Sequence, residues 1–187
     1  MIKYYADVFS VSEYDVGCTD IMTASINTGD AHPFAERLRT HARAYRDDVD
    51  VEVDKFLKAG IIEEAASPWN SNLVLIRKKE MGKLRITVDL RRLNELSYKD
   101  KHPLPRISEC LDSLSQKVWF GSLDISQSYY QVALAVGSRD CTAFSTRRGQ
   151  FGFTQIPQGH CNSPAVFSRL MQLVLRGLNY LASLISR

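Results

Sequence analysis

The stretch SLDISQSYYQV, residues 122–132, carries a single carboxylate, Asp124, where an apolar run is interrupted by a Ser-Gln-Ser step. Apolar and β-branched residues favour a strand and small polar residues favour a turn, so the pattern predicts that Asp124 ends a strand. A carboxylate on a rigid element is a good ligand for a hard divalent cation. A turn aspartate that bonds to its own backbone is the simpler alternative. The chemistry therefore depends on what lies near Asp124.

A second candidate group is basic. Between Arg77 and Arg106 the chain has ten Lys or Arg residues and four Asp or Glu residues. The strand-like NLVLIR and LRITV flank KKEMGK, which predicts a hairpin with Lys78 at its turn and Arg85 just after it. Arginine pairs with phosphate oxygens through a planar fork and lysine acts as a point charge, so this pair suits a triphosphate. The alternative is an ordinary solvated face of basic side chains.

The third candidate is the loop in PQGHCNSPAVF, where Gln158 precedes Gly159. Ser163 and Pro164 are typical of a helix start, and backbone N–H groups at such a start favour phosphate or sugar contacts. A plain helix entry is the alternative. A carboxylate, a basic hairpin and a polar glycine loop together indicate nucleotide chemistry.

The remaining pattern predicts the elements that must position these residues. Residues 47–59 and 107–114 have helical apolar spacing, and a longer amphipathic helix is expected from residue 163. Short strands are expected at YYQVAL, CTAFST and QFGFT. Helices packed on a mainly antiparallel sheet make the predicted fold class α+β.

Composition excludes several classes of protein. At 187 residues and 44% hydrophobic content, the chain can bury a core, as one domain or one domain with an extension. It has no apolar run of membrane-spanning length and no signal-peptide pattern, so we expect no membrane partner and an intracellular location, cytoplasmic or nuclear, without secretion. The cysteines lack metal-ligand spacing, which favours reduced buried thiols. They are Cys18, Cys110, Cys141 and Cys161.

Six sequence blocks follow one another in a specific order. They are GIIEEAASPWNSNLVLIRKK, GKLRITVDLRRLNE, KHPLPRI, SLDISQSYYQV, TAFSTRRGQFGFTQIPQGHCNSPAVFSRLM and VLRGL. These blocks resemble the reverse transcriptase domain of gypsy-type LTR retrotransposons, which is part of a retrovirus-like Pol polyprotein. The similarity extends over most of the chain from about Tyr4, and YYADVFS resembles the segment that precedes this domain. We therefore expect a lead-in at residues 1–45 and the fingers with part of the palm at residues 46–187.

The resemblance implies the fingers and palm of a right-hand polymerase that copies an RNA or DNA template-primer with deoxynucleoside triphosphates. Asp124 matches the first of the catalytic aspartates that bind two Mg²⁺ ions. Lys78 and Arg85 match fingers residues that hold the triphosphate, and the backbone of Ile125 lies where that triphosphate is bound.

Two further matches concern the sugar of the incoming nucleotide. Tyr129 matches the aromatic gate that would collide with a 2′-OH, although a core tyrosine is an alternative. Gln158 matches a polar residue near the sugar and triphosphate. Many gypsy-type sequences resemble PFG at this point, so the PQG of this chain is more similar to retroviral sequences.

The other two metal-binding aspartates of the family belong to a Tyr-x-Asp-Asp hairpin after the VLRGL block. Here the chain reads VLRGLNYLASLISR, and no aspartate follows Asp140. We therefore expect an RNA-directed DNA polymerase fragment, truncated before the hairpin, thumb, ribonuclease H and integrase portions and inactive alone. The alternatives are a non-catalytic nucleic-acid-binding or co-opted interaction module, and a gene-model fragment without a stable fold.

Overall fold

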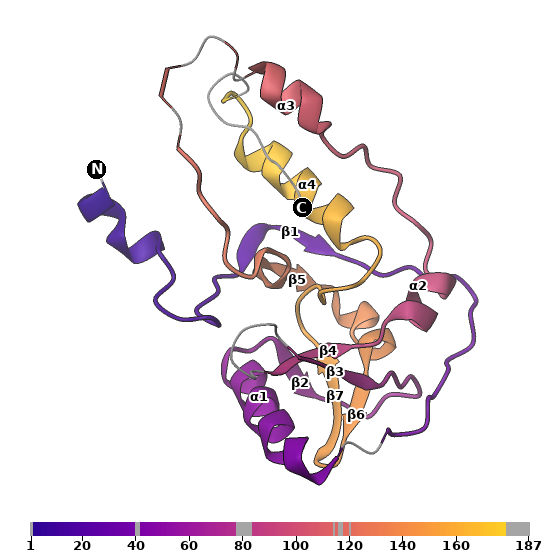
Figure 1. The fold of residues 1–187 in the computed structure, drawn as a ribbon. Coiled ribbons are helices and arrows are strands. Elements are labelled where there is room, and N and C mark those ends of the chain that lie inside the picture. Colours follow the sequence, from indigo (N-terminus) through magenta and orange to yellow (C-terminus); the bar gives the residue numbers. More distant parts are fainter. Residues whose placement is uncertain are drawn as a thin grey trace.

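The computed structural model describes residues 2–39, 42–77, 84–113, 115, 118–119 and 121–178. Short strands and helices alternate along the chain and pack into one body, from which the first helix stands apart (Figure 1). With η marking a 3₁₀-helix, the elements in chain order are η1 (Ile2–Val8), β1 (Thr19–Ala24), η2 (Arg43–Tyr45), α1 (Arg46–Lys58), β2 (Ile62–Glu64), β3 (Leu73–Arg77), β4 (Leu84–Val88), α2 (Arg91–Leu96), α3 (Ile107–Ser113), η3 (Ser128–Gln131), β5 (Val132–Leu134), η4 (Val136–Ser138), η5 (Asp140–Thr142), β6 (Phe144–Thr146), β7 (Gly149–Phe153) and α4 (Ser163–Val174).

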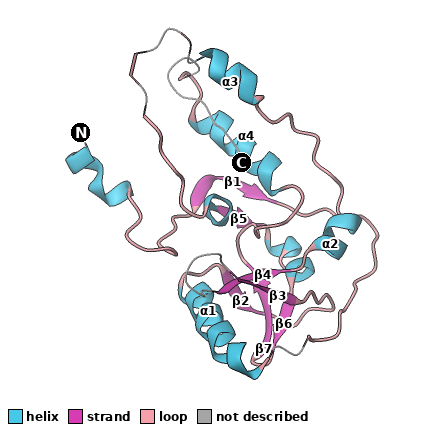
Figure 2. Cartoon of the chain, in the orientation of Figure 1, coloured by secondary structure: helices cyan, strands magenta, loops and turns pink. Residues whose placement is uncertain are grey.

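The described strands form three small sheets. β2, β7 and β6 make an antiparallel sheet in that order, β3 and β4 form an antiparallel hairpin, and β1 pairs with β5 in parallel. A bridge between Ser71 and Phe144 joins the hairpin to β6, and a bridge between Ala133 and Gln155 joins β5 to the segment after β7. The strands therefore run through the middle of the fold, with α1 at one end and α3 and α4 at the other (Figure 2). The predicted α+β class is confirmed.

Helix α1 shows why the predicted helices form. Val49, Val53 and Phe56 lie on one face and are buried. Gly60, with φ +68°, follows the helix, and the Gly60 and Ile61 N–H groups donate to the Leu57 and Phe56 carbonyls at 3.0 Å each. This pattern is a Schellman ending, which needs a left-handed residue that glycine adopts without a steric penalty.

Aromatic side chains fill the centre of the core. The Phe144 ring lies 6.0 Å from that of Phe151 and 5.5 Å from that of Phe153, measured between centroids. All three side chains are at most 3% exposed, and they come from the two paired strands β6 and β7. Because each buried aromatic side chain removes a large apolar area from water, this pair of strands anchors the sheet against α1.

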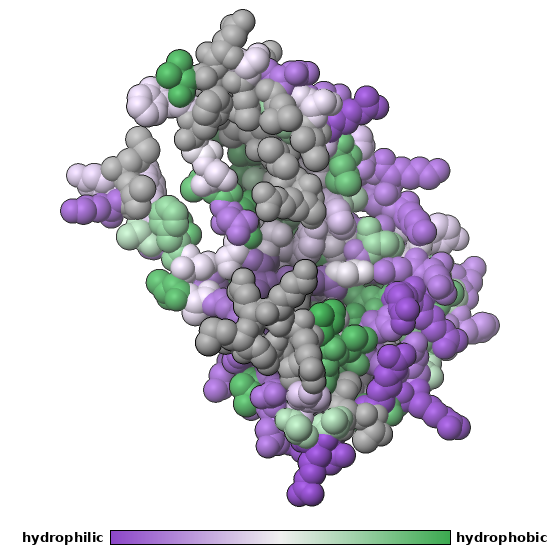
Figure 3. Space-filling model, viewed as in Figure 1, coloured by the Kyte–Doolittle hydropathy of each residue, from purple (hydrophilic) through white to green (hydrophobic). Residues whose placement is uncertain are grey.

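Charged side chains connect α1 to the turn between β6 and β7. Arg148 Nη1 lies 2.6 Å from Asp54 Oδ1, and Arg147 forms ion pairs with Asp47 and Asp50 of the same helix. Exposed pairs of this kind each contribute little to stability. The three aspartates in these pairs account for much of the acidic excess in α1. Figure 3 shows further hydrophilic residues along the right-hand side of the molecule.

Part of the predicted lead-in belongs to the same core as the rest of the chain. Ala24, Ile26 and Phe34 are buried there. Ser138 Oγ accepts a hydrogen bond from the Ile26 N–H at 3.0 Å, and the Asn70 N–H donates to the Phe34 carbonyl at 2.8 Å. Residues 19–36 thus pack as an integral part of the fold, whereas the preceding η1 exposes several large apolar side chains, among them Tyr4, Tyr5 and Val8.

Some predicted boundaries were wrong. Residues 121–125 form no strand, because no strand in the described part of the chain lies beside them to complete the backbone hydrogen bonds. The predicted strand at YYQVAL is confirmed only for Val132–Leu134, since Ser128–Gln131 forms η3. Ser163 is the first helical residue and Asn162 takes the N-cap position. Boundary shifts of one residue are expected at helix ends.

Two further findings concern whole-chain expectations. The described helices are all too short or too polar to cross a lipid bilayer. The four cysteines are free thiols, as predicted, but only Cys110 and Cys141 are buried, and Cys18 is exposed. Burial raises the pKa of Cys141 to about 12, which keeps that thiol protonated and unreactive.

The segment around residues 118–123 should make the chain prone to associate. Val118, Trp119 and Leu123 are 82%, 91% and 84% exposed, and large apolar surfaces of this kind favour contact with other chains. We expect Trp119→Ser with Leu123→Ser to shift size-exclusion profiles toward monomer. Val136→Ser, at a position 75% exposed but outside this segment, is the control. A clean monomer of the unmodified chain at high concentration would contradict the expectation.

Candidate functional site

Asp124 is exposed at the start of a turn. Its carboxylate makes no hydrogen bond or ion pair with any residue in the described part of the chain. The next residue, Ile125, is partly buried and packs against the core. The backbone is therefore anchored directly after Asp124 while the carboxylate itself faces solvent.

The turn that follows Asp124 is held by its own hydrogen bonds. The Gln131 Nε2 donates to the Ser126 carbonyl at 2.8 Å, and the Tyr130 N–H donates to the Gln127 carbonyl at 2.9 Å. Gln127 has φ +46° and ψ +46°, the left-handed conformation that costs a non-glycine residue about 1 kcal/mol or more. Such a conformation persists only where the surroundings impose it.

Tyr129 and Tyr130 point to different partners. The half-buried Tyr129 ring packs edge-on against Phe167 of α4, with centroids 6.0 Å apart. Tyr130 is 5% exposed and lies between Phe56 of α1, at 5.9 Å, and Phe153 of β7, at 6.3 Å. The two neighbouring rings thus fasten η3 to opposite parts of the molecule. Tyr129 is neither a fully buried core residue nor a free surface residue.

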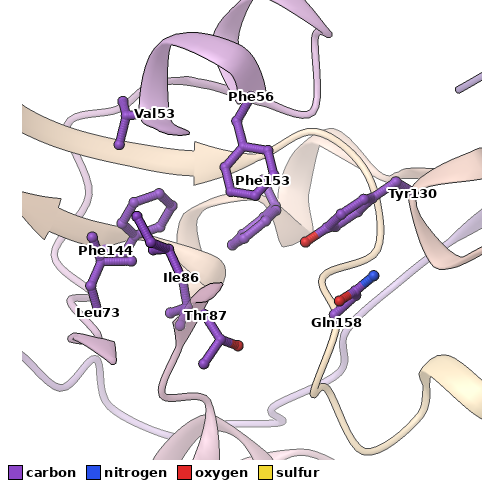
Figure 4. A pocket seen from close by; sticks show the side chains of 10 residues that line it. Val53, Phe56, Leu73, Ile86, Thr87, Tyr130, Phe144, Phe153 and Gln158 are labelled. Carbon is purple, nitrogen blue, oxygen red and sulfur yellow. The ribbon is translucent and has the colours of Figure 1, made fainter. Parts of the chain in front are cut away.

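Gln158 meets the turn from the other side. Its Nε2 donates to Gln127 Oε1 at 2.6 Å, across 31 positions of sequence. Gln158 also lines a pocket with Tyr130 and with Ile86, Thr87 and Val88 of β4 (Figure 4). Gln158 is therefore joined by a hydrogen bond to the turn that begins at Asp124 and carries Ile125 and Tyr129.

The loop that presents Gln158 is fixed by α2. Asn94 Nδ2 donates to the Gly159 carbonyl at 2.9 Å, and Asn94 Oδ1 accepts from the Cys161 N–H at 2.8 Å. The Ser163 hydroxyl donates to the Pro157 carbonyl at 2.9 Å and closes the loop. Gly159 has φ +90°, so a residue without a side chain is needed directly after Gln158.

His160 ties the same loop to the end of α2 from within. Its side chain is 3% exposed, and its Nε2 lies 3.3 Å from the Ser97 hydroxyl, which donates to the Leu93 carbonyl. Burial lowers the pKa of His160 to about 4, so the ring is neutral at physiological pH. A neutral buried imidazole here is structural, and its protonation would work against the packing of α2 on the loop.

The basic candidates are only partly described. Arg85 lies on β4, where its backbone pairs with Ile76 of β3, and its side chain lies outside the described residues. Lys78 and the rest of the predicted hairpin turn also lie outside them. β4 lines the same pocket as Gln158, so the strand that carries Arg85 runs beside the turn.

Metal ligands are the weakest part of the site. Within the part of the chain that the structure describes, no three His, Cys, Asp or Glu side chains are grouped so that they could hold a metal ion. Mg²⁺ prefers six oxygen ligands, and one exposed carboxylate supplies two at most. The described residues therefore do not form a metal site by themselves.

Two positions that shape the site were not predicted from the sequence. Asn94 lies in RRLNE and Gln127 in SQS, where the expected signals were only a short element and a turn. Their importance comes from contacts with residues far along the chain. The Ser-Gln-Ser step indicated a turn, but no signal in the sequence distinguished Gln127 within it.

The family of the chain follows from comparison with known proteins. Residues 76–184, more than half of the chain, match the reverse transcriptase (RNA-dependent DNA polymerase) family. The chain therefore belongs to the reverse transcriptase family.

Its relatives include the Pol proteins of gypsy-type elements. It is 31% identical over 179 residues to the retrovirus-related Pol polyprotein from transposon 412 of Drosophila melanogaster. This alignment covers 93% of this chain and 14% of the relative. It is 33% identical over 173 residues to the corresponding polyprotein from transposon gypsy of the same fly, and that alignment covers 90% of this chain and 17% of the relative. The chain thus spans about one sixth of these polyproteins.

Solved structures show the same fold. The protease-reverse transcriptase of prototype foamy virus superposes with a TM-score of 0.84 over 94% of this chain and 24% of the viral chain, at 23% identity. The foamy viral enzyme in complex with an RNA/DNA hybrid superposes with a TM-score of 0.82 over 99% of this chain and 25% of the viral chain, at 21% identity. The predicted family and polymerase-like fold are confirmed.

The buried His160 should make stability depend on pH. Its pKa is about 4 when folded and about 6.5 when unfolded, so the unfolded state binds more protons as pH falls. The stabilisation is complete above pH 6.5 and is lost toward pH 4, at about 1.4 kcal/mol per pH unit. Urea unfolding at pH 7 and pH 5 should show a larger loss for the unmodified chain than for His160→Gln, by up to about 2 kcal/mol.

The control for this measurement is His32→Gln, because His32 is exposed. This variant should lose as much stability on acidification as the unmodified chain. Equal losses for the unmodified chain and His160→Gln would show that His160 does not contribute to the acid response.

Proposed function

We propose that this chain is the fingers and part of the palm of an RNA-directed DNA polymerase, with residues 1–45 as the segment leading into it. The observation that supports the proposal is the turn at residues 124–131, which carries Asp124, Ile125 and Tyr129 and whose Gln127 accepts a hydrogen bond from Gln158. The family match supports the same reaction class, a template-directed transfer of deoxynucleotides.

In this proposal a deoxynucleoside triphosphate binds between the β3–β4 hairpin and the turn. Lys78 and Arg85 neutralise its phosphates, because ammonium and guanidinium groups suit phosphate oxygens. The backbone at Ile125 lies under the triphosphate. β4 lies beside Gln158 at the shared pocket, which supports the placement of these groups around one ligand.

Tyr129 and Gln158 contact the sugar in this proposal. The edge-on contact with Phe167 limits the movement of the Tyr129 ring, and a ring held in place can exclude a 2′-OH by collision. Asn94 fixes the loop at Gly159, which holds the neighbouring Gln158 near the turn. The specificity for deoxynucleotides would then come from the rigidity of the turn that carries Tyr129 and of the loop that carries Gln158.

The template-primer partner is nucleic acid, as in the foamy viral complexes, which contain an RNA/DNA hybrid or double-stranded DNA. Lys99 and Lys101 are exposed on the stretch with the excess of basic residues, which supports a contact with phosphates. Reverse transcriptases depend on divalent metal ions, and we propose that Asp124 contributes one carboxylate to Mg²⁺. The described residues hold no group of three possible metal ligands, and no aspartate follows Asp140 in the sequence, so in this proposal Asp124 has no carboxylate partners among the described residues.

A non-catalytic binding or interaction module is not favoured as the ancestral function, because the family match and the relatives are polymerase proteins. Binding without catalysis is nevertheless what the ligand count predicts for these 187 residues alone. Ancestry and activity are separate properties here, and separate measurements test them.

The chain should bind a single-stranded or hybrid nucleic acid weakly and with strong salt dependence. Neutralisation of phosphates releases counterions, so affinity falls as salt rises. A fluorescence titration with a labelled RNA/DNA hybrid at about 50 mM and about 200 mM salt measures this. Lys78→Ala with Arg85→Ala should weaken binding modestly, because other basic residues remain. Affinity that does not change with salt would contradict an electrostatic surface.

Purified alone, the chain should give no primer extension on poly-rA with oligo-dT. Two-metal phosphoryl transfer needs several carboxylates to align the attacking and leaving oxygens, and Asp124 alone cannot hold two ions. A family-like Tyr-x-Asp-Asp hairpin and thumb appended to the chain should restore extension, and Asp124→Asn should then abolish it. Robust Mg²⁺-dependent extension by the original chain, lost in its own Asp124→Asn variant, would overturn the ligand count.

In the same restored protein, Tyr129→Ala should keep extension but admit ribonucleotides. Removal of the ring leaves room for a 2′-OH, and Tyr130 still anchors η3 in the core after the Phe167 contact is lost. The measurement is extension with rUTP compared with dTTP. Tyr130→Ala is not a suitable control, because its buried ring supports the core; Tyr98→Ala, at an exposed position, is the matched one. Unchanged discrimination in Tyr129→Ala would remove Tyr129 from the gate.

A further inference from the structure

The turn at residues 126–131 and the loop at residues 157–163 are each anchored separately. η3 in the turn is fixed by Tyr130 in the core and by Tyr129 against Phe167. The loop is fixed by Asn94 from α2. Their relative position is therefore a separate question from the stability of either one.

The hydrogen bond between Gln127 and Gln158 links these two segments. The Gln158 Nε2 to Gln127 Oε1 distance is 2.6 Å, and both side chains are half-buried, so water competes only in part. Gln127 is one residue from Ser126 and Ser128 and two from Ile125 and Tyr129. A movement of the Gln127 backbone is thus transmitted directly to Ile125 and Tyr129.

The backbone of Gln127 makes this link unusual. Its φ of +46° is a conformation that glycine adopts freely and that asparagine and aspartate tolerate best. Glutamine has no such local advantage, but its longer side chain reaches the amide of Gln158. The hydrogen bond to Gln158, 31 positions away, therefore explains why a glutamine occupies a backbone conformation that disfavours it.

We propose that Gln127 is a positioning residue that couples the turn at residues 126–131 to the loop at residues 157–163, which form the two sides of the proposed nucleotide site. It holds the turn with Tyr129 and Ile125 in register with Gln158, and this role rests on the proposed function. Gln127 itself need not touch the nucleotide. The hydrogen bond between Gln127 and Gln158 sets the separation between Tyr129, the proposed gate, and Gln158, which faces the sugar in the proposed function. No single helix or strand among the described elements spans the distance between these two residues.

The first test is a spectroscopic signature of the bond in the unmodified 187-residue chain. In ¹⁵N spectra, the side-chain NH₂ signal of Gln158, assigned with Gln158→Met, should lie away from the position of a solvated amide. Gln127→Met keeps the size of the side chain but lacks the amide oxygen, so the Gln158 signal should shift away from its position in the unmodified chain. In Gln127→Glu the carboxylate can still accept a hydrogen bond from the Gln158 amide, so the signal should stay displaced at pH 7.

The matched control is Gln131→Met. Gln131 donates to the Ser126 carbonyl within the same turn and has no contact with Gln158 among the described hydrogen bonds. This variant loosens the turn without cutting the link, so the Gln158 signal should stay where it is. Equal displacement in Gln131→Met and Gln127→Met would mean that the effect is general loosening, and would overturn the proposal.

The second test is a titration with dTTP in the presence of poly-rA/oligo-dT, followed in the same spectra. Loss of one neutral hydrogen bond predicts about three- to tenfold weaker dTTP binding in Gln127→Met, and less than about twofold in Gln131→Met. Unchanged dTTP affinity in Gln127→Met would overturn the coupling. A chain that shows the Gln158 signature but binds no dTTP would overturn the proposed nucleotide site while supporting the link itself.

Discussion

The packing of Tyr130 between Phe56 and Phe153 is the contact on which the rest of the arrangement depends. The ring is almost fully buried and joins α1, the β6–β7 sheet and η3 at one point. Tyr129 immediately before it, and Asp124 a few residues earlier, take their positions from this anchor. The exposed carboxylate can therefore sit on irregular backbone without being loosely placed. The core supplies the rigidity that a paired strand would otherwise provide.

Much of the fold could be predicted from the sequence because its signals are local. The apolar face of α1 and its terminal Gly60, and the alternation in LRITV, each specify an element within a few residues. The strand expected at residues 121–125 failed for a different reason. Strand propensity describes a segment that fits a sheet, but a strand exists only where a neighbour completes its hydrogen bonds. No residue in 121–125 carries that information.

The candidate site shows the same division. Asp124, Tyr129 and Gln158 could be chosen from residue type, neighbouring turn signals and family resemblance, and the turn that carries Asp124 and Tyr129 does meet the loop that carries Gln158. Asn94 and Gln127 could not, because each acts through a contact across 31 or more positions. A side-chain hydrogen bond between distant segments leaves no periodicity in either one. Sequence patterns thus identify groups that do chemistry more readily than groups that hold them in place.

The parallel pairing of β1 with β5 has a consequence for how the chain reaches its fold. The two strands join residues at the beginning of the chain to residues near position 132, and the nearby Ile26 and Ser138 bond across 112 positions. Such contacts require closure of a very long loop, which slows folding relative to local contacts. During synthesis β1 leaves the ribosome long before its partner exists, so its edge stays open for many seconds at ordinary elongation rates. In the cell, β1 is therefore made well before β5 can complete its backbone hydrogen bonds.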